Sequence, residues 1–227
     1  MSLIRANGGG LGGAGAPGGA LGSFYSHLLD QSLKFNDDDT QYLSRTPASA
    51  GNRRTFTFSA WIKRGHFGSS QSFFSAAGNY YSFRFNSTDT MTLYGNGTDL
   101  NFQTTRKFRD PSAWYHIVVA IDTTQSATLD RVKLYINGTQ ETSFISTTSQ
   151  LNAQLAFNNT VVHTIGRRQS TTGNYFDGYI AEVNFVDGTA LTADSFGETK
   201  DGIWIPKDTS GLTFGTNGFH LTFKDDV

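Results

Sequence analysis

A stretch in the first third of the chain alternates apolar residues with others at a period of two. It covers residues 55–63, and its even-numbered positions are Phe56, Phe58, Ala60 and Ile62. Successive side chains of a β-strand point to opposite faces, so this period indicates a strand with one face against a core. We expect these four residues to be core residues.

A later stretch has the same period and begins at a turn. The pair Asp177-Gly178 is typical of turns, and the apolar residues that follow it at every second position are Tyr179, Ala181, Val183 and Phe185. We expect these four side chains on one core-facing side of a strand over residues 179–186.

Short segments of this kind recur from Phe24 onward and are separated by turn residues. The expected strands cover residues 32–35, 55–63, 80–85, 91–94, 115–122, 131–136, 163–165, 179–186 and 219–223. Four pairs favour the positive φ angles of hairpin turns, namely Asn96-Gly97, Asn137-Gly138, Asp201-Gly202 and Asn217-Gly218. The spacing predicts an all-β fold in which two antiparallel sheets form a sandwich.

One predicted strand, residues 115–122, is apolar on both faces. This indicates a central strand with material packed on each side, and we expect Trp114 to close one of its ends. We interpret His116 and His163, which lie in predicted strands, as packing residues, because lone histidines of this kind are more often structural than ligands.

Composition excludes several classes of function. Only 16% of the 227 residues are charged and the formal net charge is -1, so we expect no nucleic-acid binding, which needs clustered Lys and Arg. The absence of cysteine excludes disulfides and thiolate zinc sites. With no run of about 18 apolar residues and no signal-like start, we expect neither membrane insertion nor a secretory leader.

The first residues differ from the rest of the chain. Nine of the first 22 are glycine, and Arg5 carries the only side-chain charge there. Such a segment has no core of its own and behaves alone as a flexible coil. We divide the chain into an N-terminal arm, residues 1–23, and a domain, residues 24–227. The arm is either a loose tail or, as we favour, a segment held by a neighbouring subunit through Leu3, Ile4, Leu11 and Leu21.

Six sequence blocks carry a resemblance to a known family. They are SLKF at 32–35, FTFSAWI at 56–62, WYHIVV at 114–119, LYING at 134–138, IGR at 165–167 and FDGYIAEV at 176–183. In this order they resemble laminin-G-like jelly rolls of the concanavalin A type, over roughly residues 30 to 225. The resemblance implies two antiparallel sheets packed face to face, with the first and last strands adjacent and binding loops at one rim.

Residues 30–47 and 186–192 are more narrowly similar to laminin-G-like modules in virion proteins of tailed phages. That similarity implies a virion surface component, such as a capsid decoration or a fibre or tail protein. The implied partners are other virion proteins, in the capsid or tail, bound through the arm, together with self-association as a homo-oligomer. The implied location is the virion, assembled in the host cytoplasm.

Jelly rolls also include glycoside hydrolases, whose chemistry needs two carboxylates across the scissile bond. Here Glu182 stands alone among Ala181, Val183 and Asn184, and no nucleophile elbow, zinc-binding helix or phosphate loop is present. We therefore expect a protein that is not an enzyme and has no cofactor, with calcium as the one ion to consider.

Hard oxygen ligands gather in one expected loop, Asn36-Asp37-Asp38-Asp39. In an extended segment Asp37 and Asp39 project to the same side, so they are the candidate calcium ligands. The alternative is a solvated turn without an ion.

Two expected loop regions combine aromatic faces with polar groups, as sugar-binding sites do. Their candidate residues are Tyr80, Tyr81, Asn174, Tyr175 and Asp177. The alternative is that these aromatic rings anchor the loops. If they bind sugar, the protein is a carbohydrate-binding adhesion module on the virion or cell surface, and its partner is a host surface glycan.

Overall fold

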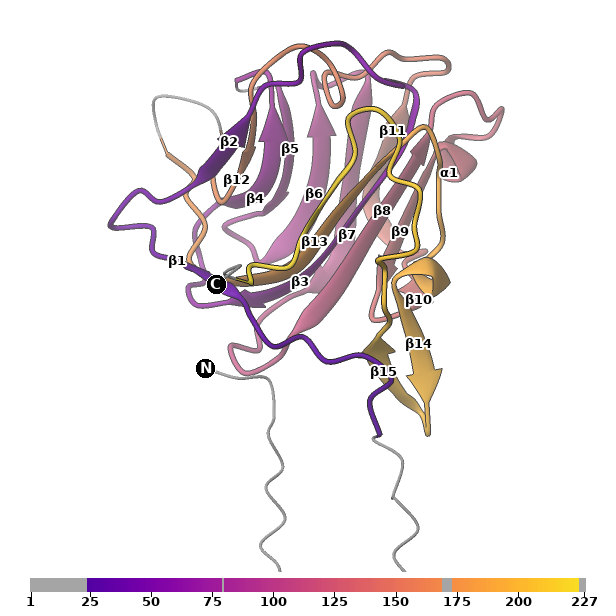
Figure 1. Cartoon of the computed structure of the whole chain (residues 1–227). Coiled ribbons are helices and arrows are strands. Elements are labelled where there is room, and N and C mark those ends of the chain that lie inside the picture. The colour runs from indigo at the N-terminus through magenta and orange to yellow at the C-terminus, as the bar shows by residue number, and fades with distance from the viewer. Residues whose placement is uncertain (1–23, 79, 169–172, 225–227) are drawn as a thin grey trace, which may run out of the picture.

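The computed structural model describes residues 24–78, 80–168 and 173–224, and this part of the chain forms a β-sandwich (Figure 1). The arm residues Leu3, Ile4, Leu11 and Leu21 lie outside the described residues. Two seven-stranded antiparallel sheets and a two-stranded ribbon make up the fold. The predicted all-β, two-sheet jelly roll is therefore confirmed.

The first sheet, called sheet A here, has the order β1-β13-β3-β8-β9-β10, and β16 also pairs with β13. Its strands are β1 (Leu33–Phe35), β13 (Gly178–Asp187), β3 (Thr55–Arg64), β8 (Tyr115–Asp122), β9 (Val132–Ile136), β10 (Thr139–Gln140) and β16 (Phe219–Leu221). The first and last strands were expected to be adjacent. Instead of pairing with each other, β1 pairs with the beginning of β13 and β16 pairs with its later part.

The second sheet, called sheet B here, has the order β11-β7-β6-β5-β4-β12-β2. Its strands are β11 (Phe144–Ser149), β7 (Leu100–Lys107), β6 (Thr90–Gly95), β5 (Tyr81–Phe85), β4 (Gln71–Ala76), β12 (His163–Ile165) and β2 (Leu43–Arg45). The remaining elements are the ribbon strands β14 (Gly197–Lys200) and β15 (Ile203–Pro206), the short helix α1 (Thr128–Arg131) and the 3-10 turn η1 (Ala193–Ser195).

All nine predicted strands are present, with ends shifted by at most two residues. The described part of the chain has seven further strands that were not predicted, among them β4. This strand lacks a simple alternation because its register shifts between Ser72 and Phe74, so that Phe73 and Phe74 both lie in the core. A bulge of this kind hides a strand from any search for a strict period of two.

Phenylalanine rings fill the space between the two sheets. Phe58 of sheet A stacks on Phe74 of sheet B with ring centroids 4.7 Å apart. Phe157, from the segment before β12, packs against Phe74 at 5.2 Å and against Phe83 at 4.6 Å. All four rings are buried. The expected core face of β3 is confirmed, because Phe56, Phe58, Ala60 and Ile62 all belong to this cluster.

The single-face prediction for β13 is wrong. Between Ala181 and Asn184 the register against β3 gains one residue, and Glu182 has a positive φ of 49°. This β-bulge reverses the alternation. Val183 therefore lies in the core between the sheets, whereas Ala181 packs on the outer face of sheet A with Leu29 and Trp61.

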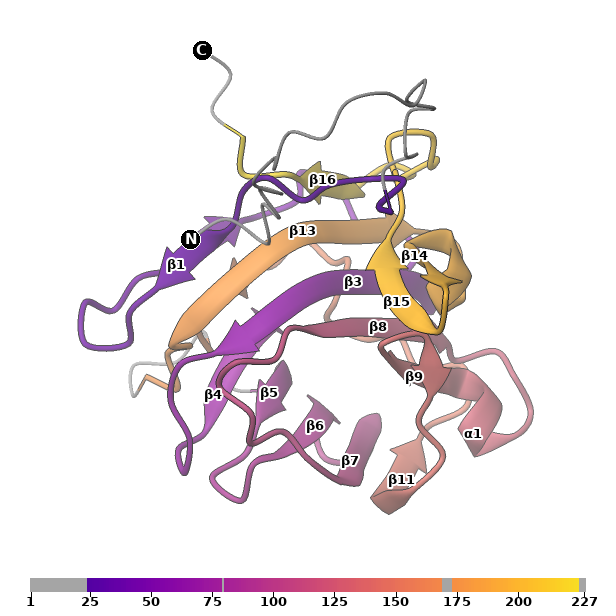
Figure 2. The same ribbon diagram turned by 90° about the horizontal axis from the view of Figure 1, so that it is seen from below.

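The outer face of sheet A is covered by the two ends of the described chain. Figure 2 shows the ribbon of β14 and β15 on the side of sheet A that faces away from sheet B, whereas β16 lies beside β13 as a strand of the sheet. Val118 of β8 and Val186 of β13 pack there against Phe196, while Ile117 and Val119 face the core between the sheets. The central strand with material on both sides is therefore confirmed. Trp114 packs near one end of β8 against Tyr179, with ring centroids 6.5 Å apart.

His116 is a packed, neutral residue under this cover. The Trp204 indole N–H donates to His116 Nδ1 at 2.9 Å, so the ring proton sits on Nε2 and donates to Ser59 Oγ at 2.9 Å. A second proton on Nδ1 would face the indole donor. Burial lowers the pKa of His116 to about 3. His163 is similar, because Asn158 N–H donates to its Nε2 and burial lowers its pKa to about 4.

Three of the four predicted hairpin pairs have positive φ at both residues, at Asn96-Gly97, Asn137-Gly138 and Asp201-Gly202. The fourth prediction is wrong, because neither Asn217 nor Gly218 has a positive φ. Asn217 is buried instead. Its amide donates to Ser49 O at 2.8 Å and to Asn158 Oδ1 at 3.0 Å, which ties three connecting segments together.

We predict that stability falls as the pH drops below about 6.5, the pKa of an unperturbed histidine. The unfolded chain then binds a proton at His116 that the folded chain excludes down to about pH 3. This stabilising contribution is complete above about pH 6.5 and is lost progressively below it, by about 2 kcal/mol at pH 5. Urea unfolding at pH 7 and pH 5 measures the difference.

His116→Asn is the matched variant for this prediction. It should be less stable than the wild type at pH 7, but its loss between pH 7 and pH 5 should be smaller by about 2 kcal/mol. An equal loss in both proteins would show that His116 does not carry this pH dependence.

Candidate functional site

The outer face of sheet B carries a polar groove of about 440 Å³. Strands β5, β6 and β7 form its floor. Ser70, before β4, and Arg168 and Asn174, between β12 and β13, form one end. The lining residues are Ser70, Arg84, Asn86, Ser87, Thr88, Thr92, Tyr94, Asn101, Gln103, Arg168 and Asn174.

Strand alternation sends the floor residues outward. In β6, Met91 and Leu93 are core residues, so Thr92 and Tyr94 point to the opposite face. The same holds for Arg84 in β5, which lies between two core phenylalanines. The hydrophobic core therefore determines which polar side chains face the groove.

Register then arranges these side chains in rows across the sheet. Arg84 lies opposite Thr92, and Thr92 lies opposite Gln103. In the next row, Tyr94 lies opposite Asn101. Neighbouring strands are about 4.8 Å apart, so each row presents polar groups at a spacing comparable to the width of one sugar ring.

Hydrogen bonds hold several of these groups in place. The Arg84 guanidinium donates to Ser82 Oγ at 3.0 Å and to Asn86 Oδ1 at 3.3 Å, and lies 4.9 Å from the centre of the Tyr94 ring. The Asn86 amide donates to Thr92 Oγ1 at 2.7 Å. Gln103 donates to Thr90 Oγ1 at 3.0 Å. The groove is therefore preorganised.

The charge in the groove is positive. Arg84 and Arg168 line it, and none of the lining residues that the structure describes is Asp or Glu. Burial lowers the pKa of Arg84, and the nearby charge of Arg168 lowers it further. Since an arginine remains protonated near neutral pH, two cationic groups share one groove in a protein whose formal net charge is -1.

The predicted sugar-binding residues are divided between the two ends of β4. Tyr80 is 60% exposed, but Tyr81 is only 7% exposed, belongs to the core and donates its hydroxyl to Asp99. The Tyr81 ring is thus an anchor and not an exposed platform. At the other end, the Asn174 carbonyl accepts from Ser72 N–H at 3.0 Å, and Asn174 is the one predicted residue that lines the groove.

Sequence reasoning did not select Arg84, Tyr94 or Gln103. The signal was present, because Arg84 and Tyr94 occupy the non-core positions of predicted strands. The alternation of apolar residues does not predict that β5, β6 and β7 pair with one another, and this pairing places Arg84, Tyr94 and Gln103 on neighbouring strands.

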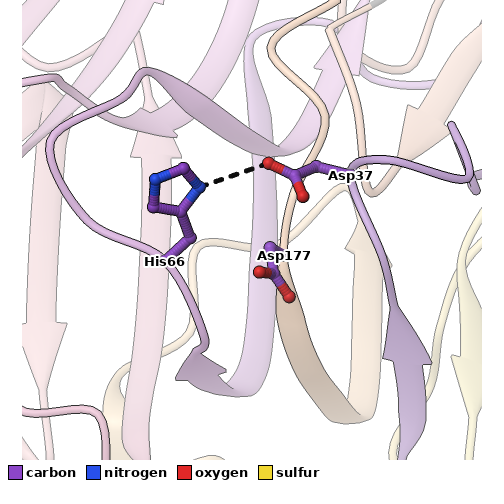
Figure 3. A group of neighbouring side chains, drawn as sticks. All are labelled: Asp37, His66 and Asp177. Atoms are coloured by element: carbon purple, nitrogen blue, oxygen red, sulfur yellow. Dashed lines mark hydrogen bonds and ion pairs between the residues drawn. The ribbon is translucent and has the colours of Figure 1, made fainter.

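A separate group of potential metal ligands lies at the end of sheet A where β1 and β3 end and β13 begins (Figure 3). It consists of Asp37, His66 and Asp177, whose ligand atoms all lie within 4.8 Å of one another. Asp39, the other candidate calcium ligand of the loop, accepts from the Asn36 amide at 2.7 Å and is not in this group.

Glu182, the carboxylate at the bulge, is buried on the outer face of sheet A. It accepts from Thr209 Oγ1 at 3.2 Å and lies against His220 Nε2. The contacts attach the C-terminal segment to β13. A structural role accounts for this carboxylate.

A second pocket, of about 230 Å³, lies between the sheets and is mainly apolar. Phe74 and Ile165 of sheet B and Phe185, Phe219 and Leu221 of sheet A contribute to its lining. It lacks the rows of hydrogen-bonding groups found in the groove. The groove on sheet B is therefore the candidate functional site.

No helix in the described ranges has the length and apolar character needed to cross a membrane.

Several solved structures are similar in fold. A proposed carbohydrate-binding protein from Bacteroides ovatus ATCC 8483 is 18% identical, with a TM-score of 0.55; the match covers 72% of this chain and 44% of that protein. Domain 4 of AbnA, a GH43 extracellular arabinanase from Geobacillus stearothermophilus, in complex with arabinotriose, is 17% identical with a TM-score of 0.49, covering 71% of this chain and 72% of that one.

Tailspike protein 2 of the Escherichia coli O157:H7 bacteriophage CAB120 is 14% identical with a TM-score of 0.49, and the match covers 73% of this chain and 23% of the tailspike. At these identities the likenesses show the fold alone. No curated protein matches the chain. Residues 37–195 match the Laminin_G_3 family model, described as the concanavalin A-like lectin/glucanases superfamily. The match covers more than half of the sequence, and the chain belongs to this superfamily.

Proposed function

We propose that the protein binds carbohydrate in the groove on the outer face of sheet B. The observation that supports this proposal is the set of polar side chains arranged in rows by β5, β6 and β7, above all Arg84, Tyr94 and Gln103. Amides and hydroxyls offer both donors and acceptors, as sugar hydroxyls require, and the Tyr94 ring adds an apolar surface.

The groove favours binding because its groups are already ordered. Asn86 is held by hydrogen bonds to Thr90 and Thr92, and Arg84 is held by Ser82 and Asn86. A ligand that meets ordered side chains loses less free energy to side-chain ordering.

The charge of the groove selects the ligand class. The two arginines in the described lining favour a glycan with acidic groups, because a guanidinium binds a carboxylate through paired, charge-assisted hydrogen bonds. We therefore propose an acidic glycan, such as one containing uronic acids, as the ligand.

We further propose that binding takes place without hydrolysis. Retaining and inverting glycosidases use a pair of carboxylates on either side of the bond. Among the described residues that line the groove, none supplies a carboxylate.

For the biological setting, we propose a virion surface protein of a tailed phage. The support is the sequence similarity of residues 30–47 and 186–192 to modules of phage virion proteins. The glycine-rich residues 1–23 would then attach the domain to another virion protein, and the groove would bind a glycan of the host surface.

The glycan proposal predicts that Arg84→Ala and Gln103→Ala weaken binding to acidic oligosaccharides. The expected loss for Arg84→Ala is at least about tenfold, or about 1.4 kcal/mol, because a charge-assisted hydrogen bond is lost. An array of matched galacturonate and galactose oligomers identifies the ligand, and titration calorimetry measures each affinity.

Arg54→Ala is the matched control, since Arg54 is an exposed arginine that does not line the groove. It should bind as the wild type does. Equal binding of acidic and neutral oligomers would contradict the ligand class, and unchanged binding by both groove variants would contradict the site.

The virion proposal predicts that a chain lacking residues 1–23 folds but is not incorporated into particles. Its unfolding midpoint should match that of the full chain, because the described core is made by residues from 24 onward. Purified particles from a complementation assay are probed for the truncated protein. Incorporation at the full-length level would show that the arm is not the attachment.

A further inference from the structure

Three side chains from distant parts of the sequence converge at one end of sheet A. Asp37 follows β1, His66 follows β3 and Asp177 precedes β13 (Figure 3). They come from three different segments, so their proximity is a property of the fold.

Strand register brings them together. Phe35, Gly178 and Arg64 lie directly opposite one another on three neighbouring strands. Asp177 is adjacent to Gly178, and Asp37 and His66 each lie two residues beyond their paired position. The three donors therefore emerge side by side from the same end of the sheet.

Their spacing suits a small metal ion. His66 Nδ1 lies 3.3 Å from Asp37 Oδ2. Two ligands of a tetrahedral ion, each about 2.0–2.1 Å from the metal, are about 3.4 Å apart. The Asp177 carboxylate offers an oxygen within 4.8 Å of both of these ligand atoms.

Gly65 makes room for the third ligand. Its backbone N–H donates to the Asp177 carbonyl at 2.9 Å, which fixes the two segments against each other. A Cβ at residue 65 would lie 2.8 Å from Asp177 Oδ1, so a side chain there would displace the carboxylate from its present position. The glycine keeps the Asp177 carboxylate beside His66.

The electrostatics of the cluster favour a cation. The carboxylates of Asp37 and Asp177 offer oxygen atoms within 4.8 Å of each other, so two acidic groups lie side by side. The third group of the cluster is the exposed imidazole of His66, whose Nδ1 lies 3.3 Å from Asp37 Oδ2. A divalent cation would neutralise both carboxylates at once.

We propose that Asp37, His66 and Asp177 bind a divalent transition-metal ion, with Zn²⁺ as the expected ion. An imidazole nitrogen suits zinc, whereas calcium prefers an all-oxygen set of six to eight ligands. This site replaces the Asp37 and Asp39 pair with a different ligand set. Three protein ligands leave a position for water or for a ligand group.

The proposed ion would stiffen one end of the groove. His66 is four residues before Ser70, and Asp177 is three residues after Asn174, and both Ser70 and Asn174 line the groove. The metal site does not depend on the proposed glycan binding, because its ligands lie outside the groove lining.

The test titrates the full chain, freed of metal with a chelator, with ZnCl₂ and separately with CaCl₂. Calorimetry should show one Zn²⁺ per chain, and the unfolding midpoint should rise by about 5 °C or more at a hundredfold excess over the dissociation constant. Co²⁺ should give the visible absorption of a tetrahedral site. CaCl₂ should have little effect.

His66→Ala and Asp177→Asn should weaken Zn²⁺ binding at least about tenfold. Asp39→Asn is the control within the same acidic loop, and His27→Ala controls for zinc bound elsewhere by histidine; both should bind Zn²⁺ as the wild type does.

Several outcomes would overturn the proposal. They are unchanged Zn²⁺ affinity in His66→Ala, a loss of binding in Asp39→Asn, or stabilisation by calcium alone. The metal-free midpoint of each variant shows whether it is folded, so a folding defect is not mistaken for a lost ligand. Glycan binding is not a readout, so failure of the glycan proposal leaves this test intact.

Discussion

The packing of phenylalanine rings between the two sheets is the interaction on which the rest of the structure depends. Phe58, Phe74, Phe83 and Phe157 form a continuous aromatic contact from one sheet to the other, and each is buried. Complete burial of such a ring stabilises the fold by about 1.5–3 kcal/mol. With no cysteine in the chain, no disulfide shares this task. The same packing fixes which residues face outward, and so it creates the polar face of sheet B as the complement of the core.

The outer face of sheet A is covered, whereas the outer face of sheet B is accessible, and the bulge at Glu182 contributes to this difference. The extra residue turns Val183 inward and leaves Ala181 and Glu182 to meet the two ends of the described chain. Glu182 accepts a hydrogen bond from Thr209, and Leu29 packs on Ala181 and Trp61. Sheet A is thereby a buried, structural sheet. Sheet B keeps an outer groove that is accessible to a ligand.

A period of two was enough to predict nine strands and the sandwich, because a half-buried strand must alternate. It failed where a bulge changes the phase, in β13 after Ala181 and in β4, where Phe73 and Phe74 both lie in the core. The site was less predictable. Whether a loop tyrosine is a platform or an anchor depends on distant residues, and Tyr81 is an anchor through Asp99. Asp37, His66 and Asp177 are far apart in the sequence, and only strand register brings them together.

The floor of the groove lies on paired strands, whereas Asp37, His66 and Asp177 lie on connecting segments. Arg84, Tyr94 and Gln103 lie on paired strands above a packed core, so their positions are set by the fold. Asn174 and Ser70 lie on connecting segments, and these segments are the ones that carry Asp177 and His66. A change in the cluster can therefore alter the end of the groove without disturbing its floor. Connecting segments usually tolerate sequence change better than strands do. Gly65 is an exception, because a side chain there would occupy the space of the Asp177 carboxylate.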